Sequence, residues 1–126
     1  MNIAEILLRR AAELGDNAAI VDVHRNHDRS YSFRELDVAT CTVAEQLRGA
    51  GLKPGDGVLL LHPVAAELYL VLIALFRLGC VAIFLDPYAG RAHIERCCAI
   101  FPPKAFFGSP RTDQERSPRT LGGTMR

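Results

Sequence analysis

The stretch Val58–Pro87 constrains this chain most, because it predicts a strand, a helix and a second strand in direct succession. Residues 58–61 form an apolar run without alternation, which is typical of a strand buried on both faces of a parallel sheet. Pro63 ends that strand because proline has no N–H to donate to a sheet ladder. Residues 64–78 carry leucine and valine at helical spacing, and residues 80–85 form a second apolar run. The pattern predicts a right-handed βαβ unit with parallel strands, and we expect every other element to pack on it.

Two residues mark the end of the predicted helix. Gly79 is expected to terminate it, since glycine readily adopts the left-handed conformation that follows many helices. Arg77 lies in the last turn, where a cation suits the helix dipole. The same two residues interrupt Leu68–Leu85, which is apolar enough to be mistaken for a transmembrane helix. Because a spanning helix needs about 20 apolar residues in one piece, we expect no membrane span.

The segment before this unit predicts a helix and a hairpin. Asn2 is expected to cap a helix over Ile3–Leu14. The expected apolar face of this helix consists of Ile3, Ile6, Leu7, Ala11 and Leu14. Strands over Ala18–Val23 and Arg29–Ser32 are expected to pair through a polar loop over residues 24–29. That loop contains His24, Asn26, His27 and Asp28, and we interpret them as a solvated tip.

Further helices and one strand complete the expected domain. Ser32 and Glu35 have the spacing of a capping box, which predicts a helix that runs to about Arg48. The apolar face expected for it consists of Phe33, Leu36, Val43, Ala44 and Leu47. A helix over Gly90–Ile100 and a short strand over Lys104–Phe107 are expected after the βαβ unit. The predicted fold class is α/β, with a parallel sheet at its centre.

Composition limits the number of domains and the partners. The 126 residues are 49% hydrophobic, enough for one domain, which we place at residues 1–110. Residues 111–126 have few large apolar side chains and are expected to be a disordered or out-of-family tail, as from a changed reading frame or a shortened chain. A formal net charge of +1 gives no reason to expect nucleic acid as a partner. The four cysteines are expected to be reduced thiols in the cytoplasm.

Three stretches together resemble the N-terminal part of the adenylate-forming enzymes, the AMP-forming acyl- and aryl-CoA synthetases. Tyr31–Leu36 is similar to a helix start of that family. Gly51–Val58 is similar to its entry to a central strand, and Leu75–Pro87 to its leucine–glycine strand that ends in Asn-Pro or Asp-Pro. The resemblance covers about residues 2–110, and residues 101–110 look most like the long-chain acyl or olefin-pathway branch.

The resemblance implies an incomplete N-terminal domain of a ligase that activates a carboxylic acid. The intact enzymes of this family use ATP, Mg²⁺ and coenzyme A, and the substrate that the resemblance implies is a small-molecule carboxylic acid, in particular a fatty acid. The family's phosphate loop, Mg²⁺-binding glutamate, ribose-binding aspartate and mobile lysine match no residue of this chain. We therefore assign no catalytic, cofactor-binding or metal-binding residue and expect no cofactor and no activity from this chain alone.

A few side chains could still carry chemistry. His93, Cys97 and Cys98 could present ligands to zinc, but a second ligand pair is missing and Cys41 and Cys80 are isolated, so we favour ordinary buried thiols. His62 follows a strand end, where it could line a ligand cleft, although we favour a role in capping the next helix. Closely spaced glycines that could hold phosphate are missing after both central strands, where Gly90 stands alone, and Gly122-Gly123 lies in the tail.

Three hypotheses remain open at this point, and the third of them is a membrane-anchored protein, which would have to partition with lipid. The first is a part of an acid-activating ligase that is inactive alone. The second is a free-standing α/β interaction module without catalysis, which would bind a partner through an unfinished sheet edge. Exposed apolar faces and unpaired strand edges also predict self-association.

Overall fold

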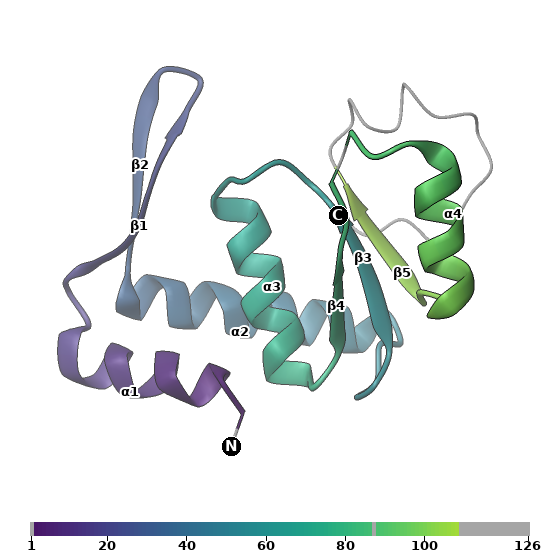
Figure 1. Cartoon of the computed structure of the whole chain (residues 1–126). Helices are drawn as coiled ribbons and strands as arrows, with labels where there is room; N and C mark the ends of the chain where they lie inside the picture. Colours follow the sequence, from purple (N-terminus) through teal and green to yellow (C-terminus); the bar gives the residue numbers. More distant parts are fainter. Residues whose placement is uncertain (1, 87, 109–126) are drawn as a thin grey trace.

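The computed structural model describes residues 2–86 and 88–108, which form four helices and five strands (Figure 1). The five strands belong to two separate sheets. In chain order they are α1 (Ala4–Leu14), β1 (Ala18–His24), β2 (His27–Ser32), α2 (Phe33–Gly49), β3 (Gly57–Leu61), α3 (Ala66–Leu78), β4 (Val81–Phe84), α4 (Arg91–Ile100) and β5 (Ala105–Gly108). The tail expected at residues 111–126, with Gly122-Gly123, lies outside the described residues. The boundary at residue 110 stays a prediction.

A three-stranded parallel sheet in the order β4-β3-β5 forms the centre of the molecule. Leu59 of β3 lies opposite Ile83 of β4 and Phe106 of β5. All five residues of β3 are buried, as the unbroken apolar run predicts. The strand–helix–strand unit with parallel strands is therefore confirmed.

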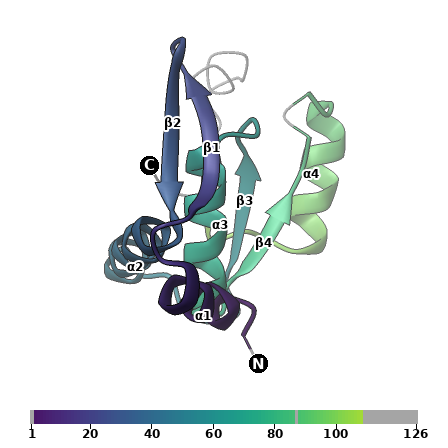
Figure 2. The ribbon, with the colours of Figure 1, turned by 90° about the vertical axis from the view of Figure 1, so that its left-hand side faces the viewer.

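The side chains of β3 alternate between two hydrophobic clusters, one on each face of the sheet. Val58 and Leu60 belong to the larger cluster, with apolar residues of α2 and α3. Leu59 and Leu61 belong to the smaller cluster, with Ile94 of α4. Figure 2 shows α3 and α4 on opposite sides of the strands. The sheet is thus covered on both faces, which explains why β3 has no polar side chain.

Helix α3 differs from the sequence prediction at its start and agrees with it at its end. It begins at Ala66 rather than Val64, because Ala65 is still extended, with φ −160° and ψ 171°. It ends at Gly79, which has φ 73° and donates its N–H to the carbonyl oxygens of Leu75 and Phe76. The left-handed end that glycine predicts is confirmed.

Helix α2 has the predicted capping box and a slightly different buried face. The Ser32 hydroxyl accepts a hydrogen bond from the Glu35 N–H, and the Glu35 carboxylate accepts one from the Ser32 N–H, both at 3.0 Å. These bonds hold the pKa of the Glu35 carboxyl below its usual value. Phe33 is only half-buried, whereas Thr40, which the apolar pattern omitted, is fully buried.

Helix α1 corrects the expected apolar face. The Asn2 side chain caps the helix as predicted, since its Oδ1 accepts a hydrogen bond from the Ala4 N–H at 2.9 Å. Ala4 is buried, however, while Ile3 and Ile6 remain exposed. The reason is that α1 contacts the body mainly through α2, so only a narrow stripe of the helix is covered. Leu14, also expected on the buried face, is exposed.

The hairpin corrects the expected polar loop. Strands β1 and β2 pair as far as His24 opposite His27, so the connection is the two residues Arg25 and Asn26. Both have positive φ, 51° and 64°, as in the tight turns whose twist matches that of the paired strands. The hairpin is a separate two-stranded sheet and projects from the body (Figure 1). The hairpin contacts the βαβ unit through α3 but shares no strand pairing with it, so the expectation that every element packs on that unit is met there only in part.

Candidate functional site at the carboxyl edge of the sheet

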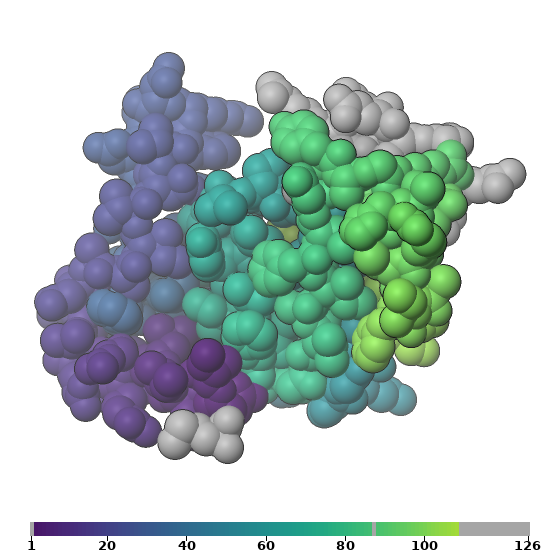
Figure 3. Space-filling view, viewed as in Figure 1, coloured from purple at the N-terminus to yellow at the C-terminus, as the bar shows by residue number. Residues whose placement is uncertain are grey.

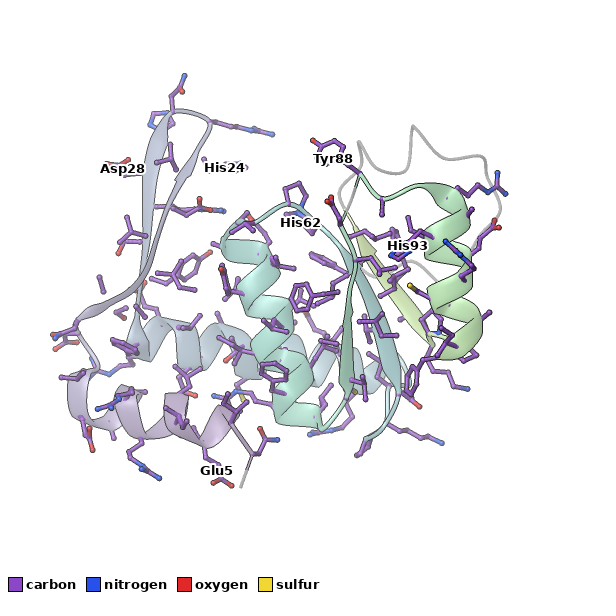
Figure 4. The ribbon with its side chains drawn as sticks, in the orientation of Figure 1. Glu5, His24, Asp28, His62, Tyr88 and His93 are labelled. Carbon is purple, nitrogen blue, oxygen red and sulfur yellow. The ribbon has the colours of Figure 1, made fainter. Side chains whose placement is uncertain are left out.

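The carboxyl ends of the three parallel strands lie at one edge of the sheet, which is where open α/β sheets bind ligands. His62 follows β3, Asp86 and Tyr88 follow β4, and Gly108 is the last residue of β5. Figure 4 shows His62 and Tyr88 at this same edge. This edge is the candidate site of the described residues.

His62 is held in one orientation by two contacts. Its ring stacks on Phe107 of β5, with centroids 5.1 Å apart and an interplanar angle of 22°. Its Nδ1 lies 2.7 Å from the Pro63 carbonyl oxygen. Because a carbonyl can only accept, Nδ1 donates its proton there, and in the neutral ring Nε2 is left as an acceptor. The half-buried imidazole is therefore restrained at the sheet edge by a ring contact and by a hydrogen bond.

The interpretation of His62 as the cap of α3 is wrong. The N–H of Ala66, the first residue of α3, donates to Asp22 Oδ2 at 3.0 Å. Asp22 lies in β1, 44 residues earlier in the chain, so no local sequence pattern could reveal this cap. The position next to a strand end suggested a role for His62 but not the neighbours that restrain it.

The connection after β4 is organised by Asp86. Its Oδ1 accepts a hydrogen bond from the Tyr88 N–H, and its carbonyl oxygen accepts one from the Ala89 N–H, both at 2.9 Å. Tyr88 is left 90% exposed at the edge. Gly90 then precedes α4, which has no side-chain cap in the described part of the chain. The connection after β3, residues 62–65, contains no glycine. Neither connection has the closely spaced glycines of a phosphate loop.

An ion cluster beside this edge joins the hairpin to α3. Arg29 of β2 donates from Nη2 to Asp22 Oδ2 at 2.6 Å and from Nη1 to Glu67 Oε1 at 2.6 Å. The hydrogen bond from Ala66, followed by that from Arg29, holds the pKa of the Asp22 carboxyl below its usual value. The hydrogen bond from Arg29 also lowers the pKa of Glu67 and raises that of Arg29 itself. The cluster is charged at neutral pH.

A second polar cluster lies between α2 and α3. Arg77 donates from Nε to the Thr40 hydroxyl at 3.2 Å and from Nη2 to the Asp37 carboxylate. The Thr40 hydroxyl in turn donates to the Asp37 carbonyl oxygen at 3.1 Å. Arg77 therefore joins two helices in addition to lying at the end of α3, where only the helix dipole was expected to matter. Arg77 lies at the end of α3 that is opposite to the carboxyl edge of the sheet. We therefore assign this polar cluster a structural role.

The possible zinc ligands come together only in part. His93 Nε2 lies 3.8 Å from Cys97 Sγ on one side of α4. Cys98 is buried in the smaller hydrophobic cluster instead. Within residues 2–86 and 88–108 no group of three or more His, Cys, Asp or Glu side chains could hold a metal ion. Cys80 is buried and donates its thiol to the Lys53 carbonyl oxygen at 3.3 Å, and burial raises the pKa of that thiol.

Cys41 is exposed on α2, and the described cysteines are not joined by disulfides. The hairpin residues His24 and Asp28, which were expected in one polar cluster, lie on opposite faces of the hairpin, because side chains alternate along a strand (Figure 4). None of the described helices is long and apolar enough to pass through a lipid bilayer.

The sequence of this chain is similar to that of a known protein family. Residues 7–123 match the family described as AMP-binding enzyme. An olefin β-lactone synthetase of Stenotrophomonas maltophilia (strain K279a) is 31% identical over 117 residues, which cover 86% of this chain and 21% of that protein. A second olefin β-lactone synthetase, from Xanthomonas campestris, is covered to the same extent. The chain thus spans about a fifth of the length of these curated relatives.

Solved structures share the fold. The N-terminal subdomain of Klebsiella oxytoca NpsA, in complex with anthranilyl-AMSN, superposes with a TM-score of 0.82 at 18% identity over 99% of this chain and 31% of that one. The crystal structure of IdnL1 gives a TM-score of 0.85 at 21% identity over 99% of this chain and 26% of that one. At these identities the likeness concerns the fold, but the family match rests on the sequence. The resemblance inferred from three short stretches is confirmed, and the chain belongs to the AMP-binding family of adenylate-forming enzymes.

Proposed function

We propose that this chain is part of an enzyme that uses ATP and Mg²⁺ to convert a carboxylic acid into an acyl adenylate and then transfers the acyl group to coenzyme A. The observation that carries the proposal is the family match over residues 7–123, joined to a parallel sheet built as in the subdomain of NpsA. In this reaction the carboxylate attacks the α-phosphate of ATP and pyrophosphate leaves. The thiol then attacks the acyl carbon and AMP leaves.

The contribution of these residues is a scaffold for that reaction. The sheet holds the ends of three strands at one edge. At this edge His62 is restrained by its stacking on Phe107, and Tyr88 is exposed. A phosphate cradle needs several backbone N–H groups freed by nearby glycines, and the two strand-to-helix connections supply one glycine between them. We therefore propose that the chain alone forms no adenylate. Separately, we propose a cytoplasmic location for the chain.

The proposed acid is a fatty acid. Support comes from residues 101–110, which resemble the long-chain acyl or olefin-pathway branch, and from relatives named olefin β-lactone synthetases. An aromatic acid is the alternative, because the similar subdomain of NpsA was solved with an anthranilyl ligand. The DNA beyond codon 110, read in all frames, provides the material for a test. A frame that encodes a Ser/Thr/Gly-rich loop followed by Lys-Gly would be expressed with this segment and assayed with a long-chain fatty acid and with benzoate.

Exchange between ATP and labelled pyrophosphate is the direct assay of adenylate formation. With the 126-residue chain, Mg²⁺ and either acid we expect exchange no faster than in the absence of protein. Exchange above that background would overturn the proposal that the chain alone is a scaffold. In the extended protein, faster exchange with benzoate than with the fatty acid would overturn the proposed substrate class.

A binding module without catalysis is the second candidate, and one observation favours it. Strand β4 is an edge strand of the described sheet, and Val81 and Phe84 at its two ends are exposed. An unpaired apolar edge invites a further strand or a second copy of the chain. Size-exclusion chromatography with light scattering distinguishes the two candidates: a monodisperse monomer or dimer favours the module, and progressive aggregation favours a segment that lacks its neighbours.

A further inference from the structure

The β1–β2 hairpin is separate from the central sheet in its strand pairing. It forms its own two-stranded sheet and shares no ladder with β3, β4 or β5. The space-filling view shows it projecting beyond the body of the molecule (Figure 3). A two-stranded hairpin is marginally stable in water, so contacts with the body decide whether it keeps its position.

One face of the hairpin carries the contact with α3. Asp22 and Arg29 lie opposite each other in the strand register, so their side chains share a face. Arg29 reaches Glu67 in the first turn of α3 with two bonds, from Nη1 to Oε1 at 2.6 Å and from Nη2 to Oε2 at 3.2 Å. Val21 and Val23, on the other face, are 70% and 65% exposed. The hairpin is therefore attached to α3 through the polar groups of Asp22 and Arg29, with the half-buried Ile20 and Tyr31 on the same face nearer its base.

The same cluster supplies the missing cap of α3. Ala65 precedes the helix and has no side chain that could accept a hydrogen bond from it. Asp22 Oδ2 accepts from the Ala66 N–H and, at the same time, from Arg29 Nη2. One carboxylate oxygen thus joins the hairpin to the start of a core helix. Release of Asp22 would leave a helix N-terminus without a side-chain partner.

One hydrogen-bond donor of the cluster has no partner in the described part of the chain when the hairpin lies against α3. Arg29 Nε is buried, yet it has no hydrogen-bond partner within the described residues. A buried donor without a partner is unfavourable, and water could bond to it once the hairpin moved away. The outer parts of the cluster are already partly exposed, with 39% of the Glu67 side chain accessible. The unpaired Arg29 Nε therefore makes the contact between the hairpin and α3 less favourable.

We propose that Asp22, Arg29 and Glu67 form a latch, and that the hairpin opens as a unit when the latch is released. In the open state the first turn of α3 frays, while β3, β4 and β5 stay folded. Such local opening is known for segments with few apolar contacts and exposed backbone. This inference concerns the motion of the described residues and is independent of the acid-activation chemistry proposed above.

Hydrogen–deuterium exchange measured by mass spectrometry tests the latch on the whole chain. In Asp22→Ala we expect faster exchange in peptides from the hairpin and from the start of α3, and unchanged exchange in β3. The loss of an ordinary hydrogen bond corresponds to acceleration of up to about tenfold. In Glu67→Gln we expect faster exchange in the hairpin but a smaller change in α3, because the Asp22 cap remains. Asp28→Ala is the matched control, since Asp28 lies on the face that points away from α3 (Figure 4).

Each outcome of this experiment decides for or against the latch. Acceleration limited to the hairpin and the start of α3 in Asp22→Ala, with Asp28→Ala like the unchanged chain, supports it. Unchanged exchange in both latch variants would overturn it, and so would equal acceleration in Asp28→Ala. If Asp22→Ala loses protection throughout, Glu67→Gln decides: loss of β3 protection there too would mean that the cluster supports the whole fold, contrary to the proposal.

Discussion

Gly79 holds a backbone conformation that other residues rarely adopt, with φ 73° at the end of α3. A Cβ there would meet Pro54 at an ordinary 3.5 Å, so the penalty of a side chain is conformational and not steric. We expect Gly79→Ala to lower the free energy of unfolding by about 1–2 kcal/mol. Gly49→Ala is the matched control, because Gly49 ends α2 without positive φ and a Cβ at that position would meet no atom within 4 Å.

For Gly49→Ala we expect no loss, and a gain of up to about 1 kcal/mol, since alanine suits a helix better than glycine. Urea denaturation of the two variants measures both effects. Equal losses of unfolding free energy in the two variants would show that the positive φ of Gly79 does not cause the destabilisation.

Glu35 gives a prediction about pH at the same scale. Its pKa is lowered in the folded chain by the Ser32 bonds, so the folded state binds fewer protons than the unfolded state just below the usual glutamate pKa. The stabilisation is complete above that usual pKa of 4.5 and is lost as the pH falls through the lowered pKa. Glu35→Gln keeps a side chain that can accept from Ser32 but cannot titrate. We expect its unfolding midpoint in urea to fall less between pH 6 and pH 3 than that of the unchanged chain, and an identical fall would contradict this.

At the scale of elements, the α2–α3 contact depends on Arg77. Its side chain is only 16% exposed and bonds to both Thr40 and Asp37. We expect Arg77→Met to lower the free energy of unfolding by about 1–3 kcal/mol, because a half-buried carboxylate and a buried hydroxyl lose their donor. Arg48→Met is the control, since the Arg48–Glu45 pair on α2 is more than half exposed and should contribute about 0–1 kcal/mol. Equal losses of unfolding free energy in urea denaturation of the two variants would show that the Arg77–Asp37 pair stabilises the fold no more than the exposed pair does.

The elements also show how far the sequence can be interpreted. Local signals predicted the right elements: the apolar run of β3, the Ser32–Glu35 box and the glycine end of α3 are all found. Signals that depend on distant residues were missed, because the partners of Arg77 and Ala66 lie 37 and 44 residues away in the chain. The polar tip was predicted too long because histidine and aspartate gave no sign of cross-strand pairing.

The candidate site was predicted only in outline. His62 was correctly noted at a strand end, since the carboxyl edge of a parallel sheet follows from the βαβ pattern. Its stacking on Phe107 could not be foreseen, because the order of β5 beside β3 depends on which strands pair, and periodicity does not determine pairing. The apolar face of α1 was overestimated for a similar reason: helical spacing shows which side chains align but not how wide the covering surface is.

At the scale of the whole molecule, β3 joins two hydrophobic clusters, so its side chains control the stability of both faces. Leu60 is 1% exposed and packs with α2 and α3. We expect Leu60→Ala to lower the free energy of unfolding by about 2–5 kcal/mol, from lost burial and the cavity left behind. Val64→Ala is the control, because Val64 is largely exposed and its truncation should change stability by no more than about 0.5 kcal/mol. A loss below about 1 kcal/mol in Leu60→Ala, measured by urea denaturation, would contradict a central β3.

The central claim is that β3 lies between β4 and β5 in a parallel sheet. Backbone nuclear Overhauser effects in the isotopically labelled chain test it most directly. We expect contacts typical of parallel strands from the backbone of Leu59 to that of Ile83 and to that of Phe106. Antiparallel contacts, or a direct pairing of β4 with β5, would contradict the account.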